Sequence, residues 1–214
     1  MSNGKGVCFL VRAAALVSGD GSQLQSVLDA VYFNEIQNFE LAAIISSSKN
    51  ANALKRAEAA GVDSFVVDPE LFPNITNHSM AVANKMRDMD IDLVILAGYS
   101  LPLGVIPYQY KNHIIGTFPS LIPSFQPNDG NIFREAIERG IKITGATAYF
   151  ADTEGCVGPI IMQQAVEVLP GDTPESLRRR IMEEAEWKLL IDVIRQYCKP
   201  GGGYEIHGSH VIRK

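Results

Sequence analysis

A short glycine-rich segment has the residue types of a site that binds an anion. It reads SGDGSQ over Ser18–Gln23 and lies between an apolar run and a segment with helical periodicity. Glycine lets the backbone approach a ligand closely, and free N–H groups at the start of a helix attract negative charge. The third glycine of a G-x-G-x-x-G dinucleotide motif would fall at Leu24. The segment predicts either an anion site, weakened by the charge of Asp20, or an ordinary turn.

The three cysteines could take part in chemistry only in suitable surroundings. Cys8, Cys156 and Cys198 lack the short spacing of a zinc site or a disulfide framework, which favours reduced thiols and no bound metal. Cys156 could attack a substrate if a neighbouring base activated its thiol, and a small buried side chain is the alternative. Asp152 and Glu154 are close in sequence and could act as an acid or a base.

The elements that would position these residues alternate between strands and helices. Apolar runs predict buried strands over residues 11–17, 39–45, 65–67 and 92–97. Four apolar residues at helical spacing predict the buried face of the first helix: Leu24, Val27, Leu28 and Val31. A second helix is expected from Asn50, its N-cap, to Ala60 before Gly61, and a third over 78–88. Ligands of such sheets bind at the carboxyl ends of strands, so the loop at 98–103 should flank one crevice with the glycine-rich segment.

The second half of the chain continues this pattern with longer strands. Strands are expected over residues 114–118, 143–150 and 160–168, and helices over 131–139 and 173–197. The prediction is one α/β domain over 11–200, with a single open, mostly parallel twisted sheet and helices on both faces. Residues 1–10 would be an N-terminal extension and 201–214 a C-terminal tail that can form a hairpin.

Composition and charge exclude several classes of protein. Of the 214 residues, 46% are hydrophobic and 20% charged, which excludes a disordered chain. The net charge of −5 argues against nucleic acid as a partner. No apolar stretch approaches the ~20 residues of a membrane helix, and the first residues make a poor signal peptide. We therefore expect a cytoplasmic protein without a membrane partner, either a monomer or a homodimer.

Three motifs, in order and at characteristic separations, give the chain a specific resemblance. Residues 18–25 read SGDGSQLQ, residues 116–123 read GTFPSLIP, and residues 156–163 read CVGPIIMQ. They resemble S-G-x-G-S-N-L-Q, N-x-H-P-S-L-L-P and D-x-G-P-[VI]-[IL]-x-Q of the glycinamide ribonucleotide formyltransferase family. The resemblance implies a formyltransferase fold with a Rossmann-like N-terminal half. It also implies formyl transfer from 10-formyltetrahydrofolate to glycinamide ribonucleotide, in purine biosynthesis, without a metal.

The family's catalytic side chains are replaced at all three matching positions. Its asparagine and histidine, which stabilise the oxyanion and move the proton, correspond to Gly116 and Phe118, and its aspartate corresponds to Cys156. Loss of one oxyanion donor typically lowers the rate ~10²–10³-fold. No catalytic residue is therefore retained. Thr117 should alternate to the other strand face, away from the missing histidine.

Binding positions are better preserved than catalytic ones. The resemblance implies a substrate and phosphate site at Gly19, Asp20, Gly21, Ser22, Gln23, Pro119 and Glu186. It implies a folate site at Tyr99, Ser100, Leu101, Pro102, Leu103, Ala151 and Asp152. Carboxylates at Asp20 and Glu183 argue against tight binding of a phosphate, and Pro102 has no N–H to donate.

Three functions remain open at this point. The first is a family member, hence a 10-formyltetrahydrofolate-dependent enzyme by descent, whose formyl transfer is lost or severely weakened. The second is a non-catalytic protein that binds a phosphoribosyl metabolite or a partner in the same crevice. The third is altered chemistry that uses Cys156, Asp152 or Glu154.

Overall fold

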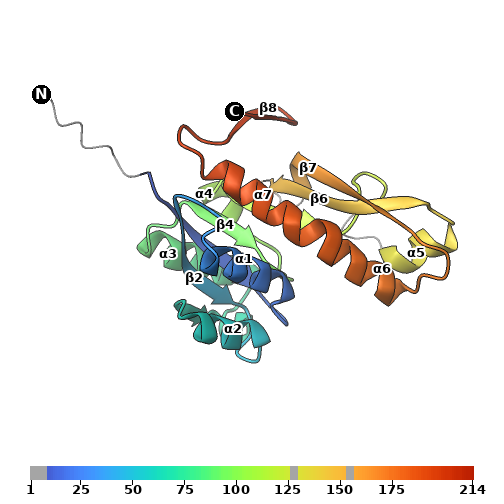
Figure 1. The fold of residues 1–214 in the computed structure, drawn as a ribbon. Coiled ribbons are helices and arrows are strands. Elements are labelled where there is room, and N and C mark those ends of the chain that lie inside the picture. Colours follow the sequence, from blue (N-terminus) through green and yellow to red (C-terminus); the bar gives the residue numbers. More distant parts are fainter. Residues whose placement is uncertain (1–8, 126–129, 153–156) are drawn as a thin grey trace, which may run out of the picture.

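A computed structural model describes residues 9–125, 130–152 and 157–214, which form an α/β fold (Figure 1). Its strands are β1 (Val11–Val17), β2 (Phe39–Ser46), β3 (Ser64–Val66), β4 (Leu93–Leu96), β5 (Ile114–Phe118), β6 (Ile143–Ala151), β7 (Val157–Glu167), β8 (Tyr204–His207) and β9 (His210–Arg213). Its α-helices are α1 (Ser22–Tyr32), α2 (Asn52–Ala60), α3 (Ile75–Asp88), α4 (Ile106–Gln109), α5 (Ile132–Glu138), α6 (Pro174–Ile181) and α7 (Trp187–Tyr197). A 3-10 turn spans Pro69–Leu71 and a π turn spans Met182–Glu186.

The strands join in one open sheet with the order β3-β2-β1-β4-β5-β6-β7-β9-β8. The pairs from β3 to β5 are parallel, and β6 runs antiparallel to both β5 and β7. The C-terminal tail forms the β8–β9 hairpin, and β9 pairs with β7 at Ile160 and His210. The predicted fold class, a mostly parallel sheet with helices on both faces, is confirmed.

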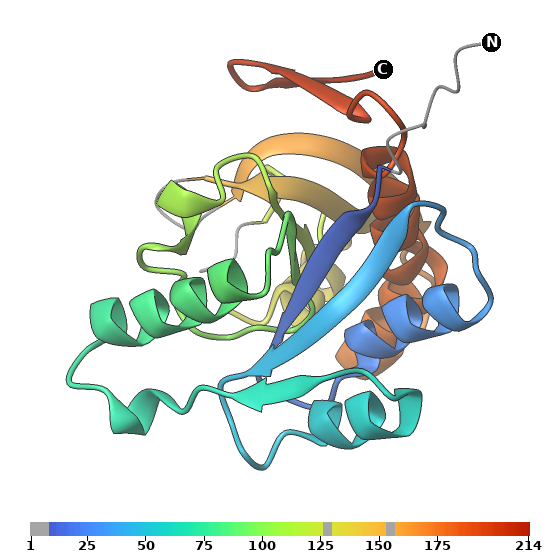
Figure 2. The same cartoon turned by 90° about the vertical axis from the view of Figure 1, so that its left-hand side faces the viewer.

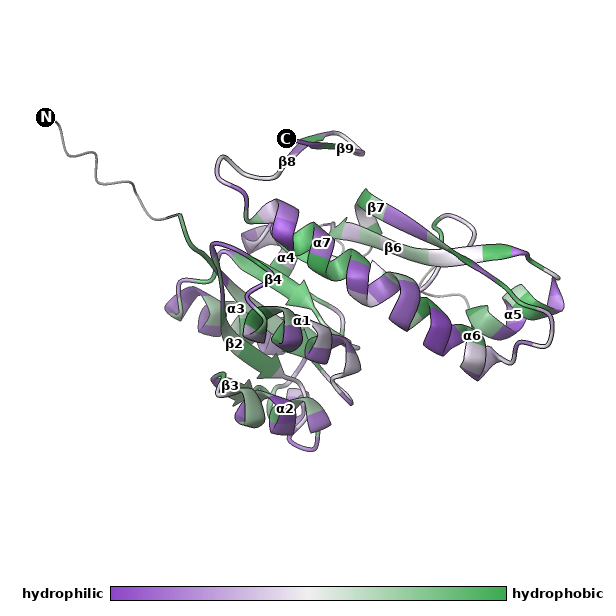
Figure 3. Cartoon of the chain, in the orientation of Figure 1, coloured by the Kyte–Doolittle hydropathy of each residue, from purple (hydrophilic) through white to green (hydrophobic). Residues whose placement is uncertain are grey.

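Alternate residues of the central strands enter two separate hydrophobic cores. On β1, Ala13 and Ala15 face a core shared with α1, α2, α5, α6 and α7, whereas Ala14 and Leu16 face α3 and α4. Figure 2 shows α3, in green, on one side of the strands and α1 and α7, in blue and red, on the other. The inner strand β4 is apolar, while α6 consists largely of hydrophilic residues (Figure 3). Burial of both faces explains the uninterrupted apolar runs in the sequence.

Most predicted helix ends lie within two residues of those in the structure, and four details differ. The third helix, predicted over 78–88, begins at Ile75, with Asn74 as its N-cap. Gly61 ends α2 with a positive φ of 68°, as predicted. However, α2 begins at Asn52 with Ala51 as N-cap and without a side-chain hydrogen bond, so the prediction of Asn50 as the cap was wrong. Val31 was expected on the buried face of α1 and is 38% exposed in the last turn. The single helix expected over 173–197 is interrupted by the π turn at Met182–Glu186.

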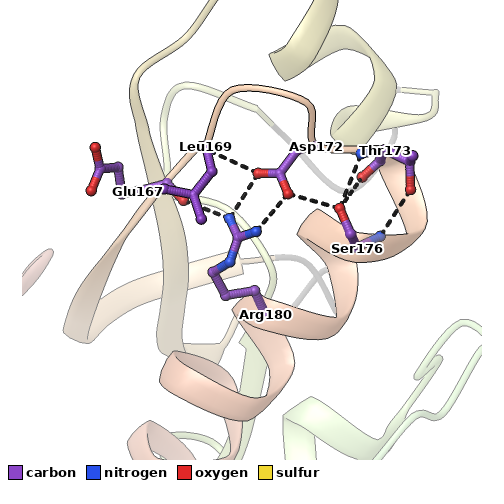
Figure 4. A network of polar contacts seen from close by, with 6 residues as sticks. All are labelled: Glu167, Leu169, Asp172, Thr173, Ser176 and Arg180. Atoms are coloured by element: carbon purple, nitrogen blue, oxygen red, sulfur yellow. Dashed lines mark hydrogen bonds and ion pairs between the residues drawn. The ribbon is translucent and has the colours of Figure 1, made fainter.

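A buried ion pair fixes the start of α6 (Figure 4). The Asp172 carboxylate accepts hydrogen bonds from Arg180 Nη1 at 2.7 Å and Nη2 at 2.5 Å, and from Ser176 Oγ at 2.7 Å. Thr173 caps the helix by accepting the Ser176 N–H at 3.2 Å. The Asp172 side chain is only 3% exposed, and the Arg180 hydrogen bonds hold its pKa well below the usual range. This network therefore anchors the helix that follows β7.

The described residues contain neither a membrane-spanning helix nor a metal-binding cluster. None of the helices there has the length and apolar character needed to cross a membrane. In the same residues, no cluster of three or more histidine, cysteine, aspartate or glutamate side chains could hold a metal ion.

Candidate functional site

The loops after β1 and β4 meet at the carboxyl ends of the parallel strands. The Ser18 N–H donates to the Gly98 carbonyl at 3.1 Å, and the Ser100 N–H donates to Ser18 Oγ at 3.0 Å. Ser18 Oγ also accepts the Ser47 hydroxyl at 2.7 Å, which joins the loop after β2. Three loops are thus fixed around one crevice, at the edge of the sheet where ligands of such folds bind.

A cavity of about 370 Å³ lies at this edge and collects every residue predicted to bind substrate or phosphate. The predicted residues in its wall are Gly19, Asp20, Gly21, Ser22, Gln23, Pro119 and Glu186. The wall also contains Gly98, from the loop that was predicted to flank this crevice, and four residues that were not predicted: Ala97, Phe133, Arg178 and Met182. Two distant parts of the chain, the glycine-rich loop and the α6 region, therefore form one site.

The glycine-rich loop is held closed by its own side chains. Gly21 has a φ of 73°, and a Cβ there would lie 2.8 Å from the Cα of Ala53, so only glycine fits. Asp20 Oδ1 accepts hydrogen bonds from the N–H and the hydroxyl of Ser22, both at 3.2 Å. Arg56 Nε donates to the Asp20 carbonyl at 3.0 Å. The Asp20 carboxylate therefore occupies one N–H group that an anion would otherwise use.

A cation missed in the sequence offsets the carboxylates around this loop. Arg178 lines the main cavity, and with Arg179 it lines an adjoining cavity of about 280 Å³ that also contains Asp20 and Glu183. Residues four apart share a helix face, so the positions of Arg178, Met182 and Glu186 carried a usable signal. The predicted pair of carboxylates lines this adjoining cavity together with Glu175, and the two arginines accompany all three.

Glu186 brings a buried carboxylate into the cavity. Only 8% of the residue is exposed, and burial raises the pKa of its carboxyl although a Thr117 hydrogen bond and the charge of Arg178 oppose this. Thr117 Oγ1 lies 2.7 Å from Glu186 Oε1, and Gln23 Nε2 lies 3.3 Å from the same oxygen. Gln23 also donates to Thr117 Oγ1. Thr117 was expected to face away from the missing histidine, and its hydroxyl contacts Glu186 and Gln23, which both line the 370 Å³ cavity.

The opposite face of β5 is filled by an aromatic ring. Gly116 pairs with Tyr149 of β6. A Cβ on Gly116 would lie 2.8 Å from both Cζ and Oη of Tyr149, and 3.2 Å from Leu96 Cδ1. Real Cβ atoms do not approach other atoms so closely, so the phenol ring takes the space that a larger residue 116 would need. Phe118 is partly buried and packs against the core that contains Ala13 and Ala15.

Comparison with known proteins supports the resemblance seen in the motifs. The sequence pattern of a family described as formyl transferase matches residues 11–194. The chain belongs to this formyl transferase family.

Several similar proteins have names that refer to purine synthesis. A phosphoribosylglycinamide formyltransferase of Bacillus subtilis is 31% identical over 86% of this chain and 92% of that protein. The trifunctional purine biosynthetic protein adenosine-3 of Gallus gallus is 31% identical over 81% of this chain, which spans only 17% of that protein. The solved structure of glycinamide ribonucleotide transformylase 1 from Symbiobacterium toebii has a TM-score of 0.89 and 37% identity, covering 96% of this chain and 94% of that one. The predicted family resemblance and formyltransferase fold are confirmed.

In this formyl transferase family member, the segment expected to bind folate follows β4. Leu103 is buried, and Pro102 and Ser100 are exposed, with the Ser100 N–H already donated to Ser18. The Tyr99 hydroxyl is buried without a described hydrogen-bond partner, and burial raises its pKa to about 12. Leu101 is half-buried in the same loop.

The remaining predicted site residues follow β6. Ala151 is buried at the end of the strand, and Asp152 lies beside Gly158, whose Cβ would come within 3.1 Å of Asp152 Cβ. Cys156 and Glu154 lie outside the described residues.

A larger cavity, of about 890 Å³, lies at the opposite edge of the sheet. Its wall includes Asp92, His113, Tyr197 and Tyr204. It contains none of the residues predicted to bind substrate or folate, so size alone does not identify the functional site.

Proposed function

We propose that this formyl transferase family member binds a phosphoribosyl ligand but has lost, or strongly slowed, formyl transfer to glycinamide ribonucleotide. One observation carries the proposal. At Gly116, where the family has its asparagine, the chain has no side chain, and the ring of Tyr149 fills the adjoining space.

The chemistry explains why this position matters. When the substrate amine attacks the formyl carbon, negative charge develops on the formyl oxygen and a proton must leave the nitrogen. Gly116 and Phe118 carry no side-chain donor or acceptor that could stabilise the oxygen or move the proton. Loss of one such donor lowers the rate ~10²–10³-fold, and losses within one catalytic unit are not additive. A rate at least ~10²-fold below that of intact family members is expected.

The described residues of the expected folate site do not fit the family's donor, 10-formyltetrahydrofolate. Pro102 has no N–H, and the N–H of Ser100 is already donated to Ser18. The phenol of Tyr149 lies beside the strand position from which the family's asparagine would reach the formyl group. These residues therefore argue against binding of this donor.

The phosphoribosyl part of the proposal rests on the opposite face of β5. Arg178 and the backbone of the glycine-rich loop would hold a phosphate, because charge-assisted hydrogen bonds are the strong ones. Glu186 lies in the same cavity and matches the family's glutamate that contacts the ribose hydroxyls, so the resemblance implies that it would accept hydrogen bonds from them. A protein that binds a metabolite without turnover is thus the second candidate, favoured by this cavity.

The direct test is turnover of 10-formyltetrahydrofolate with glycinamide ribonucleotide. The Bacillus subtilis formyltransferase, assayed in parallel, is the positive control. We expect kcat/KM at least ~10²-fold below the control. A value within tenfold of the control would contradict the proposal.

The third function, altered chemistry, has its own test. If a slow reaction is found, Cys156→Ala, Asp152→Ala and Glu154→Ala are assayed singly. Loss of the reaction in any of them, in a protein that stays folded, would favour this alternative. Retention in all three would exclude it.

A further inference from the structure

The carboxylate of Glu186 is held in the cavity through only one of its two oxygens. Thr117 and Gln23 both reach Oε1, at 2.7 Å and 3.3 Å. Among the residues that the structure describes, none donates a hydrogen bond to Oε2. A carboxylate oxygen offers about two acceptor sites, so Oε2 keeps its acceptor capacity for a ligand.

The hydrogen bonds of Thr117 have a defined direction. The amide nitrogen of Gln23 can only donate, so Thr117 Oγ1 is the acceptor in that contact. The single hydroxyl proton of Thr117 is then free to be donated to Glu186 Oε1. Gln23 and Thr117 thereby form a relay that fixes the orientation of the carboxylate.

The family motif does not require a threonine at the position of Thr117. It stands between the positions of the motif's asparagine and histidine, where N-x-H-P-S-L-L-P accepts any residue. Alternation along β5 turns its side chain toward the cavity, while Gly116 faces Tyr149. A hydroxyl at this position is therefore a feature that the family resemblance does not require.

We propose that Thr117 is a specificity-determining residue, which positions Glu186 so that Oε2 accepts the vicinal hydroxyls of a ribose phosphate. The inference rests on the proposed phosphoribosyl ligand. Arg178, in the wall of the same cavity, provides the separate anchor for the phosphate. Thr117 thus affects recognition of the sugar and leaves recognition of the anion unchanged.

The test compares two probes that differ by one hydroxyl, ribose 5-phosphate and 2-deoxyribose 5-phosphate, by calorimetric titration. The wild type is expected to bind the ribose form about tenfold more tightly, the usual effect of one hydrogen bond to a charged group. Thr117→Val removes the hydroxyl at similar volume and should bring the affinity ratio close to one. Thr117→Ser, which keeps the hydroxyl, should preserve the ratio.

A matched control acts on the other end of the ligand. Arg178→Met should weaken both probes by the same factor and leave their ratio unchanged. The inference is overturned if Thr117→Val keeps the wild-type ratio, if the wild type does not distinguish the probes, or if ribose 5-phosphate fails to bind. None of these outcomes affects the proposed loss of formyl transfer, which turnover tests separately. Circular dichroism checks that each variant is folded.

Discussion

The two faces of strand β5 have opposite characters at the crevice. On one face, Thr117 joins Glu186 and Gln23 around a cavity that also contains Arg178. On the other face, one residue earlier in the chain, Gly116 lies against the ring of Tyr149. Neighbouring residues of a strand point to opposite sides of the sheet. One strand therefore lines a cavity on one face and packs against an aromatic ring on the other.

The motif residues that match the family and those that differ from it lie in different surroundings. All seven residues predicted to bind substrate or phosphate line one cavity. At position 116, where the family motif has an asparagine, the ring of Tyr149 occupies the space that a larger side chain would need. Restoring the asparagine alone would then meet a steric obstacle.

The largest expected effect on stability concerns the face of β5 on which Gly116 lies against Tyr149. Gly116→Asn should lower the free energy of unfolding by about 3 kcal/mol, because its Cβ would collide with Tyr149 and overpacking costs this much. Chemical denaturation measures the change. The same substitution in a Tyr149→Ala background should cost less than about 1 kcal/mol relative to that background. An equal cost in both backgrounds would show that the ring does not fill the space.

A smaller effect on stability is expected at the ion pair of Asp172 and Arg180. This pair anchors α6, the helix that carries Arg178 to the cavity. Asp172→Asn should destabilise the protein by about 2 kcal/mol at neutral pH, because the partly buried Arg180 loses its charged partner. The exposed pair of Asp192 and Arg195 provides the control. Asp192→Asn should cost under about 0.5 kcal/mol in the same unfolding experiment. Equal losses would mean that burial does not strengthen the Asp172 pair.

The pH dependence of this effect has a definite sign. Arg180 lowers the pKa of Asp172 in the folded state, so the ion pair stabilises the protein above the pKa of an unfolded aspartate. That stabilisation is lost as the pH falls through the lowered pKa. The difference between wild type and Asp172→Asn should therefore shrink in acid, and a constant difference would contradict the assignment.

The smallest expected effect is a gain in protein stability when Glu186, in the wall of the cavity, is replaced. Burial raises the pKa of Glu186, so its ionised form is unfavourable in the folded protein. A raised pKa contributes stability at low pH that is lost as the pH rises through it. Glu186→Gln should therefore raise the free energy of unfolding by about 1 kcal/mol near pH 7.5, and the gain should shrink toward pH 4. A loss of stability at pH 7.5 would show that the carboxylate is needed for folding.

Much of the fold was predictable because burial on both faces leaves a clear apolar pattern. The strand at 11–17 was predicted with the bounds that β1 has, and the strand at 114–118 with those of β5. The interruption of the last helix was not predictable, since the π turn at Met182–Glu186 has no apolar period of its own. Helix caps depend on side-chain geometry, which explains the wrong cap at Asn50.

The site was predictable only where a motif or a strand end marked it. The convergence of the glycine-rich loop and Glu186 followed from the family resemblance. Tyr149 was missed because its contact with Gly116 depends on the pairing register of β5 and β6, which the sequence does not reveal. Arg178 was missed although its spacing from Glu186 could have placed both on one helix face.

The most direct test of the central claim is a pair of calorimetric titrations on the wild-type protein. One uses glycinamide ribonucleotide, which would occupy the cavity beside Thr117 and Glu186. The other uses 10-formyltetrahydrofolate, which needs the opposite face of β5, where Tyr149 lies against Gly116. We predict a dissociation constant in the micromolar range for the ribonucleotide, about −8 kcal/mol, and no measurable binding of the folate. Micromolar binding of the folate, or none of the ribonucleotide, would contradict the account.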